Sequence, residues 1–177
     1  MLGAVGVAAE AVAPGVDERA LKAGGPDSTA LRLAEAKAEA VSTRSPDAWV
    51  IGSDSIVSLD GRMFDKPADR GQAAEHLRAF SGREMTLTSA VALARNGKSD
   101  WSIADHARLT VRELSEPFIQ SYLDSEWPEV GYCVGVFRIE GRGVQLFESI
   151  AGSHFTILGM PLLPLLGALR ERGLIES

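Results

Sequence analysis

The sequence predicts one α/β domain, and three observations support this prediction. Segments with the helical spacing of apolar residues alternate with short apolar or alternating runs that are typical of strands. A chain of 177 residues, of which 45% are hydrophobic, has enough apolar surface for one well-packed core. No internal repeat, low-complexity tract or linker divides the sequence. We therefore expect a single domain over residues 1–177.

Capping residues and turn dipeptides place the elements along the chain. Helices are expected to begin where a side chain caps the first turn, at Asp27 or Ser28, at Asp69 and at Ser115. Asp-Gly and Asn-Gly dipeptides are typical of tight turns between antiparallel strands. In order, we expect a strand at 8–14, a helix from 27 or 28 to 44, a hairpin at 49–67, a helix at 69–80, strands at 83–95 and 101–114, a helix from 115 that Trp127-Pro128 ends, a strand at 144–150 and a helix at 162–172, with glycine-bearing loops at 131–143 and 152–161.

The hairpin at 49–67 carries the residues that first suggest chemistry. Its first strand is expected to start at Trp49 and to bend at a corner of small residues, 52–55. The Asp-Gly turn would bring the carboxylate of Asp54 close to the ammonium of Lys66. A carboxylate that holds a metal ion or a water, beside an ammonium that holds a phosphate, suits phosphate chemistry. The alternative is an ordinary exposed hairpin with scattered charges, and these residues alone leave it open.

Lys37 lies on the otherwise apolar face of the helix expected at 27–44, between Ala34 and Val41. Its side chain either follows the edge of the core to solvent or points into a cleft that needs a cation. Acids that hold Mg²⁺ and cations that hold phosphates are what hydrolysis of a phosphoanhydride requires. The acids expected beside a turn or a cleft are Glu18, Asp54 and Glu140.

Composition argues against several other classes of protein. A formal charge of −6 disfavours a nucleic-acid or anionic-membrane binder, although a few local cations suffice for a nucleotide. A mean hydropathy near zero without a long apolar run predicts no transmembrane helix, and the first residues lack the basic region of a signal peptide. The single cysteine, Cys133, fits a reducing cytoplasm. The histidines show no metal-ligand spacing, and the sequence has no Walker-type phosphate loop.

Several short segments form a family signature through their order and spacing, although none is specific alone. They are Asp17-Glu18-Arg19, Ala36-Lys37-Ala38, Gly52-Ser53-Asp54, Asp65-Lys66-Pro67-Ala68-Asp69, Ser81-Gly82-Arg83, 131–143 and 152–163. Together they resemble the Maf family of nucleoside triphosphate pyrophosphatases, also called septum-formation proteins. The resemblance covers essentially the whole chain and implies a curved mixed β-sheet, flanked by helices, with a deep cleft. It implies divalent-metal-dependent (Mg²⁺ or Mn²⁺) hydrolysis between the α and β phosphates of modified or non-standard nucleotides, and a link to arrest of cell division.

The resemblance also implies roles for individual residues. Asp54 corresponds to the proton acceptor that activates water, directly or through bound metal, and Glu18 to an acid that supports the metal or the water. Lys37 and Lys66 correspond to phosphate-binding lysines, which favours the cleft position for Lys37. Ser89 stands where the family usually has threonine and is expected in the cleft.

Two positions resemble those at which the family selects the nucleobase: Ser55, directly after the acid, and Glu140. Members that prefer dTTP and UTP usually have threonine and glutamine there. The run 133–141 is more similar to the branch that acts on 7-methyl-GTP, which has glutamate at the second position. An ionised carboxylate only accepts hydrogen bonds, so it suits the N–H donors of a guanine edge. That branch usually has glutamine in place of Ser55, so the base stays open, with methylated guanine favoured over pyrimidines.

One departure from the family pattern concerns the start of the chain. The family opens with a strand and a loop of serines and paired arginines that grips the triphosphate, and this sequence has no such segment. We therefore expect an unpaired sheet edge and weak or absent activity. A catalytically impaired nucleotide-binding regulator of cell division is the alternative function. A homodimer, common in the family, is a further expectation.

Overall fold

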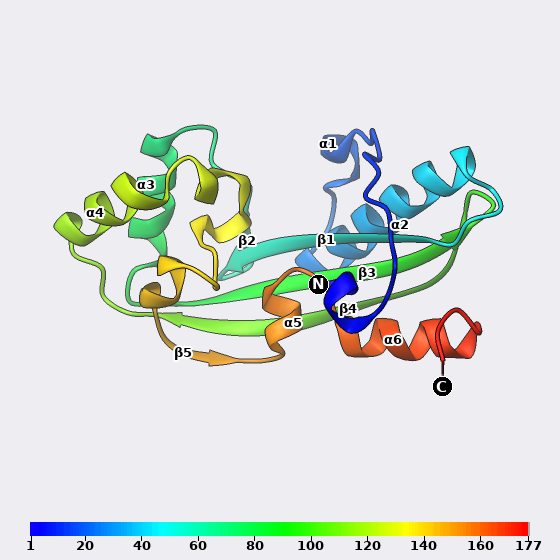
Figure 1. Cartoon of the computed structure of the whole chain (residues 1–177). Coiled ribbons are helices and arrows are strands. Elements are labelled where there is room, and N and C mark those ends of the chain that lie inside the picture. Colours follow the sequence, from blue (N-terminus) through cyan, green and yellow to red (C-terminus); the bar gives the residue numbers. More distant parts are fainter. Residues whose placement is uncertain (177) are drawn as a thin grey trace.

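A computed structural model of the protein describes residues 1–176 and shows a long, curved β-sheet with helices on both faces (Figure 1). The strands lie in the order β2-β1-β3-β4-β5. Their bounds are β1 (Val50–Leu59), β2 (Arg62–Phe64), β3 (Glu84–Arg95), β4 (Lys98–Val111) and β5 (Phe147–Ala151). The predicted single α/β domain is confirmed.

Every neighbouring pair of these strands is antiparallel, so the expectation of a mixed sheet is wrong for the described residues. Tight hairpins join β1 to β2 and β3 to β4, which reverses the chain direction each time. The strands β2 and β3 run parallel to each other, but β1 lies between them. The parallel pair that a mixed sheet needs is therefore never formed between neighbours.

The helix α2 (Pro26–Arg44) packs closely on one face of the sheet because β1 carries a glycine beneath it. A Cβ built at Gly52 would lie 2.2 Å from the backbone oxygen of Ala34 and 2.7 Å from the nitrogen of Ala38. These distances are far below van der Waals contact, so only glycine permits this approach of helix and strand. The close packing brings Lys37, on the same turn of α2, over β1.

The opposite face is covered by short elements near both ends of the chain (Figure 1). They are η1 (Leu2–Val5), α5 (His154–Ile157) and α6 (Leu162–Glu171). The apolar side chains of α6, among them Leu165 and Leu169, are buried against Val91 and Leu93 of β3. No helix among residues 1–176 combines the length and the hydropathy that a bilayer span needs.

The largest core lies at one end of the sheet, beneath a separate group of helices (Figure 1). The group comprises α3 (Arg70–Phe80), α4 (Glu116–Glu126), η2 (Glu129–Tyr132), η3 (Val134–Val136) and η4 (Arg142–Leu146). Asp69 caps α3 by accepting a hydrogen bond from the backbone of Gln72, and Ser115 caps α4, as predicted. This group and the α1–α2 region (α1, Glu18–Leu21) stand on the same side of the sheet, at different places along its length (Figure 1).

Three predicted details of the first half of the chain are wrong. α2 begins at Pro26 after Gly25 and has no side-chain cap, so neither Asp27 nor Ser28 caps it. Residues 8–14 form no strand, because they are mostly exposed and pair with no neighbouring strand. Residues 52–55 form no corner, since each pairs in register with β3 within a continuous β1. The small residues there allow the approach of α2 and do not bend the strand. The loops predicted at 131–143 and 152–161 contain 3₁₀ turns and the short α5, respectively.

The outer edge of β1 is open along most of its length. β1 pairs with β3 from Val50 to Ser58, but β2 covers its other edge only from Val57 to Leu59. From Val50 to Ile56, therefore, no described strand pairs with the outer edge. The expected unpaired edge is present, and the predicted site residues gather around it.

Candidate active site

The open edge of β1 lets side chains from both faces of the sheet reach one cleft. Because successive side chains of a strand point to opposite faces, Asp54 faces α2 and Ser55 faces the side of α5. The cleft has two parts, of about 780 Å³ and about 490 Å³, each within the usual size range of small-molecule sites. Both parts are lined by Asp54, Ser55, Lys66 and Val134, which therefore mark their junction.

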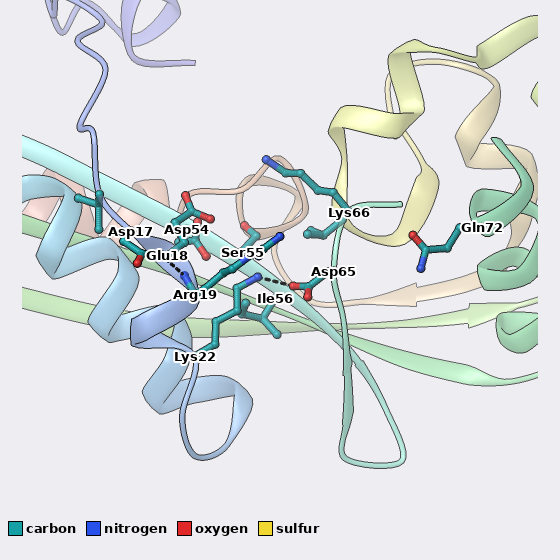
Figure 2. Close-up of a pocket in the computed structure, with 12 residues that line it drawn as sticks. Asp17, Glu18, Arg19, Lys22, Asp54, Ser55, Ile56, Asp65, Lys66 and Gln72 are labelled. Atoms are coloured by element: carbon teal, nitrogen blue, oxygen red, sulfur yellow. Dashed lines mark hydrogen bonds and ion pairs between the residues drawn. The ribbon is translucent and has the colours of Figure 1, made fainter. Parts of the chain in front are cut away.

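We call the larger part the charged arm, because acidic and basic side chains dominate its wall (Figure 2). Its lining residues besides the junction are Val16, Asp17, Glu18, Arg19, Lys22, Ile56, Asp65 and Gln72. We call the smaller part the apolar arm. Its lining residues besides the junction are Lys37, Ser53, Leu87, Tyr132, Cys133, Phe137, Arg138, Ile139, Glu140, Ile157, Leu158 and Gly159.

Lys37 holds the two predicted catalytic acids together. Its Nζ lies 2.5 Å from Oδ1 of Asp54 and 2.8 Å from Oε1 of Glu18. Glu18 is in place because Asp17 caps the short helix α1 through the backbone N–H of Arg19. Two of the three N–H donors of the ammonium are used in these bonds, so one remains for a phosphate oxygen. The side chain of Lys37 thus lies in the cleft and does not follow the edge of the core to solvent.

The protonation of these three groups follows from burial and from their mutual bonds. Burial of the Asp54 carboxyl raises its pKa above the ordinary 3.8, and the hydrogen bond from Lys37 offsets only part of this effect. The hydrogen bond from Lys37 lowers the pKa of the more exposed Glu18. Burial alone would lower the pKa of Lys37, but its bonds to both acids outweigh burial and raise it. Asp54 is thus the more basic carboxylate, as a proton acceptor requires.

Three basic residues line the charged arm, namely Arg19, Lys22 and Lys66. Lys22 pairs with Asp65, which anchors the loop after β2 to the end of α1 (Figure 2). Lys66 forms no ion pair within residues 1–176, although it lines both arms. Figure 2 shows its side chain leaving the loop after β2 and extending toward the side of the arm that holds Asp54. Lys66 therefore has all its donors available to an anionic ligand.

The apolar arm combines aromatic and aliphatic walls with one acid. Tyr132 is 70% exposed although it lines the arm, whereas Phe137, which lines it too, is buried. Glu140 is exposed and makes no hydrogen bond within the described chain. Burial raises the pKa of the Cys133 thiol, so it stays protonated at neutral pH and is unsuited to act as a nucleophile. This arm can hold a flat, partly apolar group whose edge donates hydrogen bonds.

Ser55 lies at the junction of the two arms, but Ser89 does not line either arm. Ser89 belongs to β3, one strand inward from the open edge, and its residue is fully buried. It lies opposite Ser55 in the β1–β3 register, with 2.7 Å between the two hydroxyl oxygens. The expectation that Ser89 lies in the cleft is corrected: it forms a second layer behind Ser55.

The metal expected from the family resemblance has a limited set of protein ligands. Among residues 1–176, no three or more His, Cys, Asp or Glu side chains form a metal-binding group. Asp54 and Glu18 are two acids of the cleft that bind the same cation, Lys37. Mg²⁺ is often bound by only two protein carboxylates and takes its other ligands from water and substrate phosphates, so this pair of acids fits it.

Three residues of the cleft were not predicted from the sequence as site residues: Lys22, its partner Asp65, and Tyr132. Lys22 follows Glu18 by four residues, the spacing of one helical turn, which was an available signal. Its pairing with Asp65, 43 residues away, could not be deduced from local sequence. Tyr132 lies in the glycine-bearing segment that was expected to have room for a ligand.

Comparisons with known proteins agree with the resemblance seen in the sequence. A family model described as Maf-like protein matches residues 1–172. A 7-methyl-GTP pyrophosphatase of Rhizobium etli is 51% identical over 168 residues, which cover 92% of this chain and 84% of that protein. A 7-methyl-GTP pyrophosphatase of Rhizobium meliloti is 46% identical, with 100% and 92% covered. A nucleoside triphosphate pyrophosphatase of Nitrobacter hamburgensis is 46% identical, with 99% and 89% covered.

Proposed function

The chain belongs to the Maf family, and from this premise we propose that it is a nucleoside triphosphate pyrophosphatase. It cleaves the bond between the α and β phosphates of a triphosphate, giving a nucleoside monophosphate and pyrophosphate. The observation that carries this proposal is the position of Asp54 at the junction of the two arms. A nucleotide with its base in the apolar arm and its β and γ phosphates in the charged arm has its α phosphate at the junction, beside Asp54.

In the proposed reaction, Asp54 accepts a proton from a water molecule while the water oxygen attacks the α phosphorus. Its raised pKa, caused by burial, makes it a stronger base than an exposed aspartate. The bond from the α phosphorus to the bridging oxygen breaks, and the electron pair leaves with pyrophosphate. Lys66 and the third donor of Lys37 stabilise the charge that develops on the phosphate oxygens.

We propose that a divalent cation, Mg²⁺ or Mn²⁺, acts with these residues, held by Asp54 and Glu18 and by phosphate oxygens. When bound, it would neutralise phosphate charge and favour ionisation of a water molecule. The pairing of both acids with Lys37 keeps them ionised and close together before the substrate arrives.

For the base, we propose 7-methylguanine. The support is the acceptor-only carboxylate of Glu140 and the exposed aromatic ring of Tyr132 in the same arm. Methylation at N7 gives guanine a positive charge, which an aromatic face and a carboxylate both favour. Two of the relatives described above are named for this substrate, and a third carries the general name. The dTTP or UTP alternative needs a hydrogen-bond donor that Glu140 does not offer.

We also propose that the protein works in the cytoplasm, since its single cysteine suits a reducing compartment. A homodimer remains a proposal on family grounds, and sedimentation analysis at several concentrations would test it.

The test is product analysis with a panel of triphosphates (7-methyl-GTP, GTP, UTP, dTTP and ATP) and Mg²⁺ or Mn²⁺. The proposal predicts that the products released from 7-methyl-GTP, at however low a rate, are pyrophosphate and the monophosphate, and that Asp54→Asn abolishes this release. Release of orthophosphate would contradict the assigned bond. Tight binding of 7-methyl-GTP without hydrolysis would instead favour the alternative of an impaired nucleotide-binding regulator.

A further inference from the structure

We propose that Ser89 is a positioning residue that fixes the hydroxyl of Ser55 as a hydrogen-bond acceptor toward the cleft, and thereby selects a base edge that donates. This inference rests on the proposed function and concerns how the same site chooses its base. Ser89 touches neither the substrate nor the reacting atoms. It acts through Ser55, its partner across β1 and β3.

The direction of each hydrogen bond follows from counting protons. Ser89 Oγ lies 2.7 Å from the carbonyl oxygen of Thr156, and a carbonyl can only accept, so the single hydroxyl proton of Ser89 is used there. Ser55 Oγ lies 2.7 Å from Ser89 Oγ. Since Ser89 has no second proton to give, Ser55 must donate in this bond. The chain of donors therefore runs from Ser55 to Ser89 to the backbone of α5.

Burial fixes the direction of these two hydrogen bonds. Ser89 and Thr156 are both fully buried, so no solvent competes for their hydrogen bonds. The hydroxyl of Thr156 donates to Oδ2 of Asp105 at 2.5 Å, which holds α5 against β4. If Ser55 turned its proton into the cleft, one hydrogen bond to the buried Ser89 would be lost.

The consequence lies on the face of β1 toward α5, where Ser55 lines the apolar arm. With its proton committed to Ser89, Ser55 presents only lone pairs to a ligand. Glu140, in the apolar arm, also presents only acceptors when it is ionised. A guanine edge offers N1–H and N2–H₂ donors, which match two acceptors. Uracil and thymine have a carbonyl on each side of their single N–H. One of the two acceptors of the site would therefore face a carbonyl oxygen of the base, which is also an acceptor.

The experiment compares Ser89→Ala with Ser89→Thr. In Ser89→Ala, the Ser55 proton has no partner and can turn into the cleft, so we expect the preference for 7-methylguanine over uracil to fall by about fivefold to tenfold. In Ser89→Thr, the hydroxyl is kept and the preference should stay. Ser102→Ala is the matched control, because it removes a 2.7 Å bond to Glu35 away from both arms.

Two readouts are needed: the ratio of kcat/KM for 7-methyl-GTP and UTP, and the ratio of Kd for the two monophosphates by calorimetry. Both ratios should fall in Ser89→Ala, with a melting temperature like that of the Ser102→Ala control. An unchanged Kd ratio in Ser89→Ala, or an equal fall in Ser89→Thr, would overturn the inference. If the parent chain releases no pyrophosphate, the proposed function fails, but the Kd ratios still test the role of Ser89.

Discussion

The two arms of the cleft differ in how their polar groups are held. In the charged arm, Asp54 and Glu18 both bind Lys37, which lines the other arm, and Lys22 binds Asp65, so most charges are positioned by an ion pair. In the apolar arm, Glu140 makes no hydrogen bond within residues 1–176, and Tyr132 is largely exposed. The difference indicates that the charged arm is organised for chemistry before binding, whereas the apolar arm acquires its partners from the base.

This contrast predicts that Asp54→Asn has the largest effect and that the effect is the same for every base. The amide keeps the size of the carboxylate but cannot accept a proton, so kcat should fall by about 10²–10⁴-fold. Pyrophosphate release from 7-methyl-GTP and from UTP measures it. Asp65→Asn, which changes the Lys22 pair in the same arm, should cost much less. A strong fall for one base only would contradict a separation between the arms.

The second prediction tests the packing of α2 on β1 that places Lys37 against Asp54. In Gly52→Ala, the added methyl group would overlap the backbone of α2 at Ala34, so the free energy of unfolding should fall by about 1–3 kcal/mol. Because α2 also carries Lys37, kcat should fall while the ratio of kcat/KM for the two bases changes little. Chemical denaturation checks the stability.

Gly167→Ala is a matched control for this substitution. Gly167 lies within α6, and no atom lies within 4 Å of a Cβ built there. Its replacement should stabilise the protein by up to about 1 kcal/mol, because alanine favours helix. If Gly52→Ala also stabilised the protein, or if Gly167→Ala destabilised it as well, the explanation from the close packing at Gly52 would be wrong.

The third prediction concerns the apolar arm alone. Glu140→Gln replaces an acceptor-only carboxylate with an amide that also donates. The ratio of kcat/KM for 7-methyl-GTP to that for UTP should fall by about tenfold, while kcat for 7-methyl-GTP changes little. Steady-state kinetics on both substrates measure this. If kcat fell equally for both, Glu140 would belong to the chemistry and not to base selection.

The smallest expected effect is the position of the acidic limb in the pH profile. Burial raises the pKa of Asp54, so its basic form, and with it kcat/KM, is lost at a higher pH than for an ordinary aspartate. Lys37 favours the ionised form of Asp54, so Lys37→Gln should move the acidic limb to still higher pH. A limb that moved down in Lys37→Gln would remove Lys37 from this role.

Local sequence predicted the helices and hairpins well, because their signals are local. Asp69 and Ser115 cap the helices as expected, and the Asp-Gly turn joins β1 to β2. The strand expected at 8–14 failed because strand formation depends on a partner, which the segment itself does not reveal. The small residues at 52–55 were taken for a bend, since the sequence does not show that α2 lies against Gly52.

The site was predictable in its residue types and much less in its contacts. The family signature placed Asp54, Glu18, Lys37 and Lys66 at one cleft, and the structure brings them together. The bonds of Lys37 to both acids depend on how closely α2 packs on β1. The hydrogen bonds from Ser55 to Ser89 and on to Thr156 depend on the register of β1 and β3. Those quantities arise from packing between distant segments, so no spacing in the sequence encodes them.

The product that carries the water oxygen after hydrolysis tests the proposed role of Asp54 most directly. Because Asp54 lies at the junction of the arms, it should direct water to the α phosphorus. Hydrolysis of 7-methyl-GTP in H₂¹⁸O, followed by mass spectrometry of both products, measures this. We predict one ¹⁸O atom in the monophosphate and none in pyrophosphate. Label in pyrophosphate, or release of orthophosphate, would contradict the account.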